Sequence, residues 1–68
     1  MINANELKAY ITRKGMTQAE VAKHLNMSPK TFYTHLQKGV FGSDDIEKMV
    51  VLLDIPDPVS VFFASLVT

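Results

Sequence analysis

The sequence contains no cysteine and no tryptophan, and it has only three glycines and three prolines among 68 residues. The lack of cysteine excludes disulfides and thiolate metal sites, and it fits a reducing compartment. The first residues do not combine a basic segment with an apolar run, and no apolar stretch approaches membrane-spanning length. We therefore expect a soluble cytoplasmic protein that forms one domain over residues 1–68 and has no membrane partner.

Net charge is also absent, because seven Lys and Arg residues balance seven Asp and Glu residues. The charges are nevertheless separated along the chain. Residues 1–42 hold six basic and two acidic side chains, a net charge of +4, whereas residues 43–68 hold one basic and five acidic side chains, a net charge of −4. A basic half can face a polyanion while the acidic half faces away. The neutral total therefore does not exclude a nucleic-acid partner.

Helix start and stop signals predict five short helices, and hence an all-α bundle. The first spans about residues 5–14, with Asn3 or Asn5 as its cap and Gly15 as its stop. Apolar residues recur at helical spacing along the first four segments. The expected inward side chains are Leu7, Tyr10, Ile11, Val21, Ala22, Leu25, Phe32, Leu36, Ile46, Met49, Val50 and Leu53.

The second and third helices carry the clearest signals. Thr17, followed by Glu20 three residues later, is typical of a capping box at the start of a helix. Asn26 tolerates the left-handed conformation that ends a helix. Ser28 is a suitable cap for the third helix, and Pro29 suits its first position, where no N–H is needed. Two helices joined by a three-residue turn indicate a helix-turn-helix.

The segment after the third helix is expected to close the core and begin a fourth helix. Gly39 and Gly42 bracket a loop in which Phe41 is the expected apolar plug. Ser43 is expected to cap the fourth helix, which Pro56 and a second proline end. Residues 59–67 are expected to form a fifth short helix, although the pattern VSVFF also fits a strand.

This C-terminal segment is unusually apolar. As a helix from Pro58 it would bury Val59, Phe62, Phe63 and Leu66, with Val61 and Val67 towards the flank. Apolar side chains on more than one face favour an exposed patch, whereas a small domain can also use all of them in its core. Our interpretation is a candidate protein interface formed by Val59, Phe62, Phe63, Leu66 and Val67.

The chain resembles the Cro and phage-repressor type of helix-turn-helix proteins over roughly residues 7–55. The resemblance rests on residues 17–22 (TQAEVA), residues 25–28 (LNMS) and the apolar Phe32. Residues 31–39 (TFYTHLQKG), Phe41, Ile46 and residues 52–56 (LLDIP) are similar to small phage-encoded Cro-like proteins from Gram-positive hosts. The resemblance implies a lambda-repressor-like bundle with a helix-turn-helix formed by its second and third helices.

The resemblance also implies site residues. Gln18 would bind a phosphate of a double-stranded DNA operator, and the third helix would read the major groove. Asn26 departs from the family's turn glycine, and Pro29 removes a side chain that many members use to hydrogen-bond bases. The implied DNA-binding residues are Gln18, Ser28, Pro29, Lys30, Thr31, Tyr33, Thr34, Gln37 and Lys38, and Lys14 and Lys23 are candidates for further phosphate contacts.

Two functions stay open at this point. One is a sequence-specific transcriptional regulator of a phage lysis-lysogeny switch, which would act in the bacterial cytoplasm and bind tightly as a homodimer. The other is a modulator or antirepressor that uses the same fold to bind a phage repressor protein. The basic half favours the first, and Pro29 together with the apolar C-terminal segment favours the second.

Other patterns do not indicate an enzyme, a cofactor or a metal. His24 and His35 lie eleven residues apart on different expected helices, without further ligands at metal-binding spacing. The acidic residues Asp44, Asp45 and Glu47 are explained by the positive end of the fourth helix dipole. No nucleophile stands beside a base, and no glycine-rich phosphate loop follows a strand.

Overall fold

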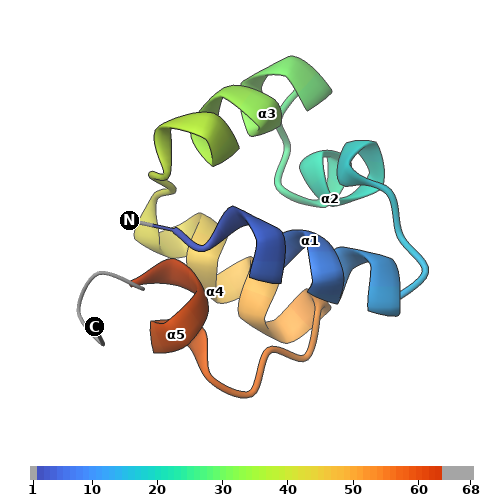
Figure 1. Cartoon of the computed structure of the whole chain (residues 1–68). Helices are drawn as coiled ribbons and strands as arrows, with labels where there is room; N and C mark the ends of the chain where they lie inside the picture. The colour runs from blue at the N-terminus through green and yellow to red at the C-terminus, as the bar shows by residue number, and fades with distance from the viewer. Residues whose placement is uncertain (1, 64–68) are drawn as a thin grey trace.

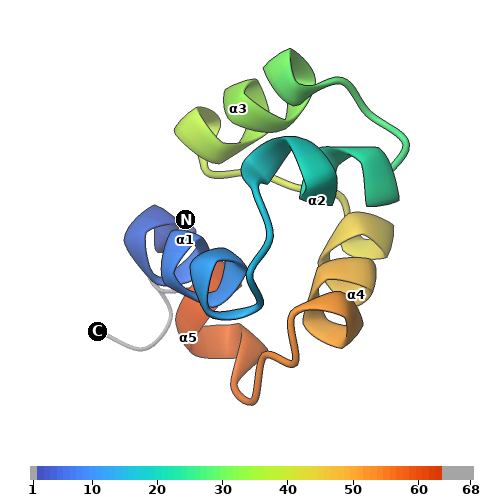
Figure 2. The same ribbon diagram turned by 90° about the vertical axis from the view of Figure 1, so that its right-hand side faces the viewer.

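Residues 2–63 are described by a computed structural model, and they form five α-helices. The helices are α1 (Ala4–Arg13), α2 (Gln18–His24), α3 (Pro29–Lys38), α4 (Ser43–Leu52) and α5 (Pro58–Phe62). In both views α3 lies at the top of the bundle and α5 at the bottom, with α1 and α4 at intermediate height (Figures 1 and 2). The predicted all-α bundle is confirmed, and α2 and α3 pack together as a helix-turn-helix. Within residues 2–63 no helix has the length and apolar character needed to cross a membrane.

Local side-chain chemistry sets the ends of α1. The Oδ1 atom of Asn3 accepts a hydrogen bond from the backbone N–H of Glu6 at 3.1 Å, so Asn3 is the cap and Asn5 lies inside the helix. The helix consequently begins and ends one residue earlier than predicted. Gly15 follows it with a φ of +70°, a conformation that glycine adopts without steric cost. The predicted stop at Gly15 is confirmed.

The signals around α2 and α3 are confirmed in detail. The Thr17 hydroxyl accepts from the Glu20 N–H at 3.1 Å, and the Glu20 carboxylate accepts from the Thr17 N–H at 2.9 Å. Asn26 has a φ of +57° in the turn. The Ser28 hydroxyl accepts from the Thr31 N–H at 3.1 Å, and the first residue of α3 is proline. Both helices therefore begin with satisfied backbone donors.

The predicted cap of α4 is wrong by one residue. Gly42 occupies the cap position with a φ of −66°, and because glycine has no side chain it makes no capping side-chain hydrogen bond. Ser43 is already the first helical residue. Because the helix begins at Ser43, Asp44 and Asp45 fall in its first turn, where carboxylates interact favourably with the helix dipole. Glu47 lies beyond that turn.

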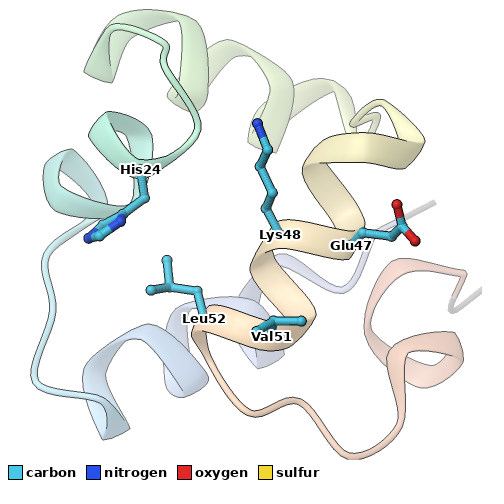
Figure 3. Close-up of a pocket in the computed structure, with 5 residues that line it drawn as sticks. All are labelled: His24, Glu47, Lys48, Val51 and Leu52. Atoms are coloured by element: carbon cyan, nitrogen blue, oxygen red, sulfur yellow. The ribbon is translucent and has the colours of Figure 1, made fainter.

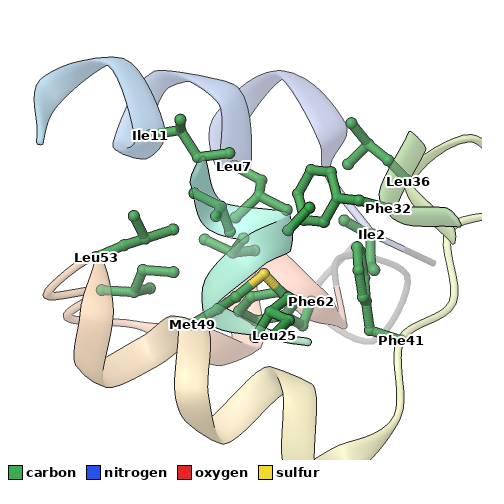
Figure 4. Close-up of a cluster of buried hydrophobic side chains, with 14 residues drawn as sticks. Ile2, Leu7, Ile11, Leu25, Phe32, Leu36, Phe41, Met49, Leu53 and Phe62 are labelled. Atoms are coloured by element: carbon green, nitrogen blue, oxygen red, sulfur yellow. The ribbon is translucent and has the colours of Figure 1, made fainter. Parts of the chain in front are cut away.

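A single apolar cluster fills the space between the helices (Figure 4). Phe41 is 6% exposed, and its ring centroid lies 5.4 Å from that of the fully buried Phe32, so the predicted plug is confirmed. None of the buried residues in the described range is polar or charged. The cluster consists of Ile2, Leu7, Ile11, Val21, Ala22, Leu25, Phe32, Leu36, Phe41, Met49, Leu53, Ile55, Val61 and Phe62.

Helix α5 is shorter than predicted and rotated relative to the expected face. It ends at Phe62, with its start capped by Asp57. Val61 is fully buried and Phe62 is buried, whereas Val59 and Phe63 are 45% and 41% exposed. The expectation that Val59 and Phe63 point inward and Val61 lies at the flank is therefore wrong. The physical reason is a tertiary contact, because the Val61 carbonyl accepts a hydrogen bond from the Asn3 N–H at 2.7 Å and holds this side of α5 against α1.

Candidate nucleic-acid interface

The position of α3 is fixed by its apolar inner face. Phe32 and Leu36 are buried, and Ala22 of α2 is fully buried in the same cluster. The turn between the helices is tied to α2, because the Met27 N–H donates to the Ala22 carbonyl at 3.0 Å. A small side chain at Ala22 permits close approach of the helices, and the fixed turn sets their angle. These contacts fix the position of α3 against α2.

The outer face of α3 is polar and positively charged. The helix contains two lysines and neither aspartate nor glutamate. All residues that the resemblance implies as DNA contacts on or before this helix are exposed to solvent, which leaves them accessible to a partner. They are Ser28, Pro29, Lys30, Thr31, Tyr33, Thr34, Gln37 and Lys38.

Side chains on this face hydrogen-bond to a neighbouring side chain or to the helix backbone, a feature that the sequence did not reveal. The Gln37 Nε2 donates to the Tyr33 hydroxyl at 3.1 Å, and the Thr34 hydroxyl donates to the Lys30 carbonyl at 3.0 Å. Both bonds join residues four positions apart, which are neighbours on a helix surface. The sequence offered only the spacing of four residues, which shows that the two residues of each pair are neighbours. It does not show which rotamers their side chains adopt.

Gln18 is the first residue of α2 and is half-buried. Its backbone N–H belongs to the first turn, where N–H groups lack intrahelical acceptors and favour anions. Thr17 and Glu20 satisfy two of the donors at this end through the capping box. The placement of Gln18 agrees with the phosphate contact that the resemblance implies, and the contact itself stays a prediction.

Charge around the helix-turn-helix is predominantly basic. Lys23 is exposed on α2, and Lys38 is exposed at the end of α3. Lys14, another predicted phosphate contact, forms an ion pair with Asp54 after α4. The pair joins the basic and acidic halves of the chain and makes Lys14 the weaker candidate for binding DNA.

The two histidines lie in different surroundings. The ring of His35 stacks on that of Phe41 with centroids 5.4 Å apart, and its Nδ1 lies 3.0 Å from the Val40 carbonyl oxygen. His24 borders a hollow of about 470 Å³ between α2 and α4, which Leu52 also lines (Figure 3). Among residues 2–63 no three His, Asp or Glu side chains are placed to hold a metal ion.

This hollow contains an exposed apolar side chain that sequence reasoning missed. Val51 is 78% exposed and lines the hollow together with Glu47 and Lys48. Val51 lies in the run MVVLLDI, in which nearly every residue is apolar, so composition alone does not show that its side chain is exposed. The inward spacing of Met49 and Leu53 was the signal that would have placed Val51 outside.

The predicted protein interface is only partly available. Phe62 belongs to the core, Val59 and Phe63 are exposed, and Leu66 and Val67 lie outside the described residues. A smaller apolar hollow of about 190 Å³ adjoins this segment. Its lining consists of Ile2, Gly39, Val40, Phe41, Ile46, Phe62 and Phe63.

Comparison of the chain with protein-family models, with curated proteins and with solved structures gives no match. The functional argument consequently rests on the residues and geometry of the helix-turn-helix.

Proposed function

We propose that the protein is a sequence-specific DNA-binding regulator of a phage lysis-lysogeny switch in a bacterial cell. The observation that supports this most directly is the exposed outer face of α3, which is free of carboxylates and carries Lys30, Thr34 and Gln37. In a helix-turn-helix, the second helix enters the major groove while contacts to phosphate fix its register. Bound at an operator, the domain would exclude RNA polymerase.

The individual roles follow from side-chain chemistry. The Lys30 ammonium suits the O6 and N7 acceptors of guanine, and Pro29 can contact a thymine methyl group. The Thr34 hydroxyl uses its proton on the Lys30 carbonyl, so its lone pairs are left to accept from a base amino group. Gln18 and the start of α2 would hold a phosphate. A homodimer would place two α3 helices about 34 Å apart along the DNA, one helical turn.

Fluorescence anisotropy with two DNA duplexes tests this function. One duplex carries the sequence upstream of the protein's own gene, and the other is random. The double variant Lys30→Ala with Thr34→Ala should bind the upstream duplex at least about tenfold more weakly, because a base contact contributes about 1–3 kcal/mol of discrimination. Lys8→Ala with Thr12→Ala is the matched control, since it removes an exposed Lys and Thr at the same spacing from α1.

Two results would contradict the proposal. The first is that the natural protein binds the upstream duplex no better than the random duplex. The second is that the α3 double variant binds the upstream duplex as tightly as the control variant does. Repeating the titration at two salt concentrations separates phosphate contacts from base reading, since each neutralised phosphate contributes about −0.9 to the slope of log affinity against log salt.

A second candidate function is supported by the hollow beside α5. Exposed Val40 and Phe63 adjoin buried Phe41 and Phe62 there, which gives an apolar surface suited to a protein partner. On this proposal the protein is a modulator that binds a phage repressor. Size-exclusion chromatography with the repressor encoded beside it should show a complex that Phe63→Ser weakens. Val51→Ser is the control, and an unchanged elution of the natural protein at micromolar concentration would refute this function.

A further inference from the structure

Tyr33 and Gln37 form a hydrogen-bonded pair on the outer face of α3. The Gln37 Nε2 lies 3.1 Å from the Tyr33 hydroxyl oxygen and donates to it. Tyr33 is 51% exposed and Gln37 is also exposed, so both polar ends face solvent. Ordering two long side chains before binding lowers the conformational entropy that a ligand must otherwise overcome. The pair is therefore a preorganised feature of this surface.

The bond leaves one donor on each residue, beside the acceptor oxygen of the Gln37 amide. A glutamine amide has two N–H donors, and the bond to Tyr33 uses one of them. The phenol oxygen accepts in this bond, so its own O–H is left to donate elsewhere. The two donor atoms lie 3.1 Å apart, and both residues are exposed on α3. A phosphate offers only acceptor oxygens, and of the base edges in the major groove only guanine offers two neighbouring acceptors.

The position along α3 favours phosphate over guanine. The recognition helix of a helix-turn-helix, here α3, contacts the bases with its N-terminal residues. Gln37 lies in the last turn of α3. Lys38 follows it and is exposed, which adds a positive charge at the same end. We propose that Tyr33 and Gln37 together form a phosphate clamp for the DNA backbone, an inference that rests on the proposed DNA-binding function.

The clamp makes a specific prediction for single and double variants. Tyr33→Phe should weaken binding to the upstream and random duplexes by about the same factor, roughly tenfold, as expected when a hydrogen bond to a charged group is lost. Gln37→Ala should have a similar effect. Because each residue orients the other, the double variant should lose about as much DNA-binding affinity as either single variant. Two independent contacts would instead give a loss of roughly hundredfold.

Tyr10→Phe provides the matched control. Tyr10 lies on α1 with Arg13 4.9 Å above its ring, and removal of its hydroxyl should leave DNA binding unchanged. A second measurement replaces successive DNA phosphates by uncharged methylphosphonates. Replacement of the phosphate that the clamp holds should weaken DNA binding by the natural protein. The same replacement should not weaken DNA binding by Tyr33→Phe any further. A purely structural effect of the variant would not remove this positional sensitivity.

Each outcome decides between the two proposals. Binding by the natural protein that neither Tyr33→Phe nor Gln37→Ala weakens overturns the clamp alone. A loss confined to the upstream duplex assigns the pair to base reading and also overturns the clamp. Absence of binding to both duplexes overturns the clamp and the DNA-binding function together. Equal losses on both duplexes, with a non-additive double variant, support the clamp.

Discussion

Removal of the Phe41 ring should take away a large part of the free energy of unfolding of the protein. The ring is almost fully buried, and it contacts the rings of Phe32 and His35 with centroids 5.4 Å away in both cases. Phe→Ala substitutions in cores cost about 3–5 kcal/mol. A domain of 68 residues has a free energy of unfolding of roughly 3–10 kcal/mol. Phe41→Ala therefore removes a third or more of the total stability, and the orientation of α3 depends on the same contacts.

Urea unfolding followed by far-ultraviolet circular dichroism measures this effect. Phe41→Leu retains much of the volume but loses the aromatic pairing, so it should cost about 1–1.5 kcal/mol. Val40→Ala is the control at the neighbouring exposed position and should change stability by at most about 0.5 kcal/mol. A loss below about 1 kcal/mol for Phe41→Ala, or an equal loss for Val40→Ala, would refute the assignment of Phe41 as the plug between α3 and α4.

Four further variants, at three positions, test local features of the fold by the same unfolding measurement. Thr17→Ala should cost about 1 kcal/mol because it removes one half of the capping box, and an unchanged midpoint would contradict the role of that cap. Asn26→Ala should cost about 1–2 kcal/mol at its positive φ, whereas Asn26→Gly should be nearly neutral; equal effects would show that the left-handed backbone is not the cause. Lys14→Met should cost less than about 1 kcal/mol, with the difference shrinking at high salt, since Lys14 and Asp54 are both substantially exposed.

Features that depend on nearby residues could be predicted from the sequence. Thr17 and Glu20 are three positions apart, and Asn26 and Gly15 carry their own backbone preferences, so the cap of α2 and these two turns followed from local chemistry. The spacing of Phe32 and Leu36 also predicted the inner face of α3 because a ten-residue helix provides enough turns for periodicity.

Features that depend on tertiary contacts could not be predicted. A five-residue helix has too few turns to define a face, so the orientation of Val59 and Val61 was decided by the backbone of Asn3 instead. The exposure of Val51 within an apolar run, in contrast, could have been predicted from the helical spacing of Met49 and Leu53. At the candidate site, residue types and exposure followed from the sequence, whereas the bond between Tyr33 and Gln37 required side-chain rotamers.

The hydrogen bond between Asn3 and Val61 also bears on when this protein can fold. It joins positions near the two ends of the described chain, and it sets Val61 and Phe62 into the core. During synthesis the chain emerges from its N-terminus, so α1, α2 and α3 have emerged before α5 has left the ribosome. The core is completed only after residue 62 is free. A chain interrupted before that point lacks Val61 and Phe62, so apolar surface around Leu7 and Ile2 would be open to proteases and chaperones.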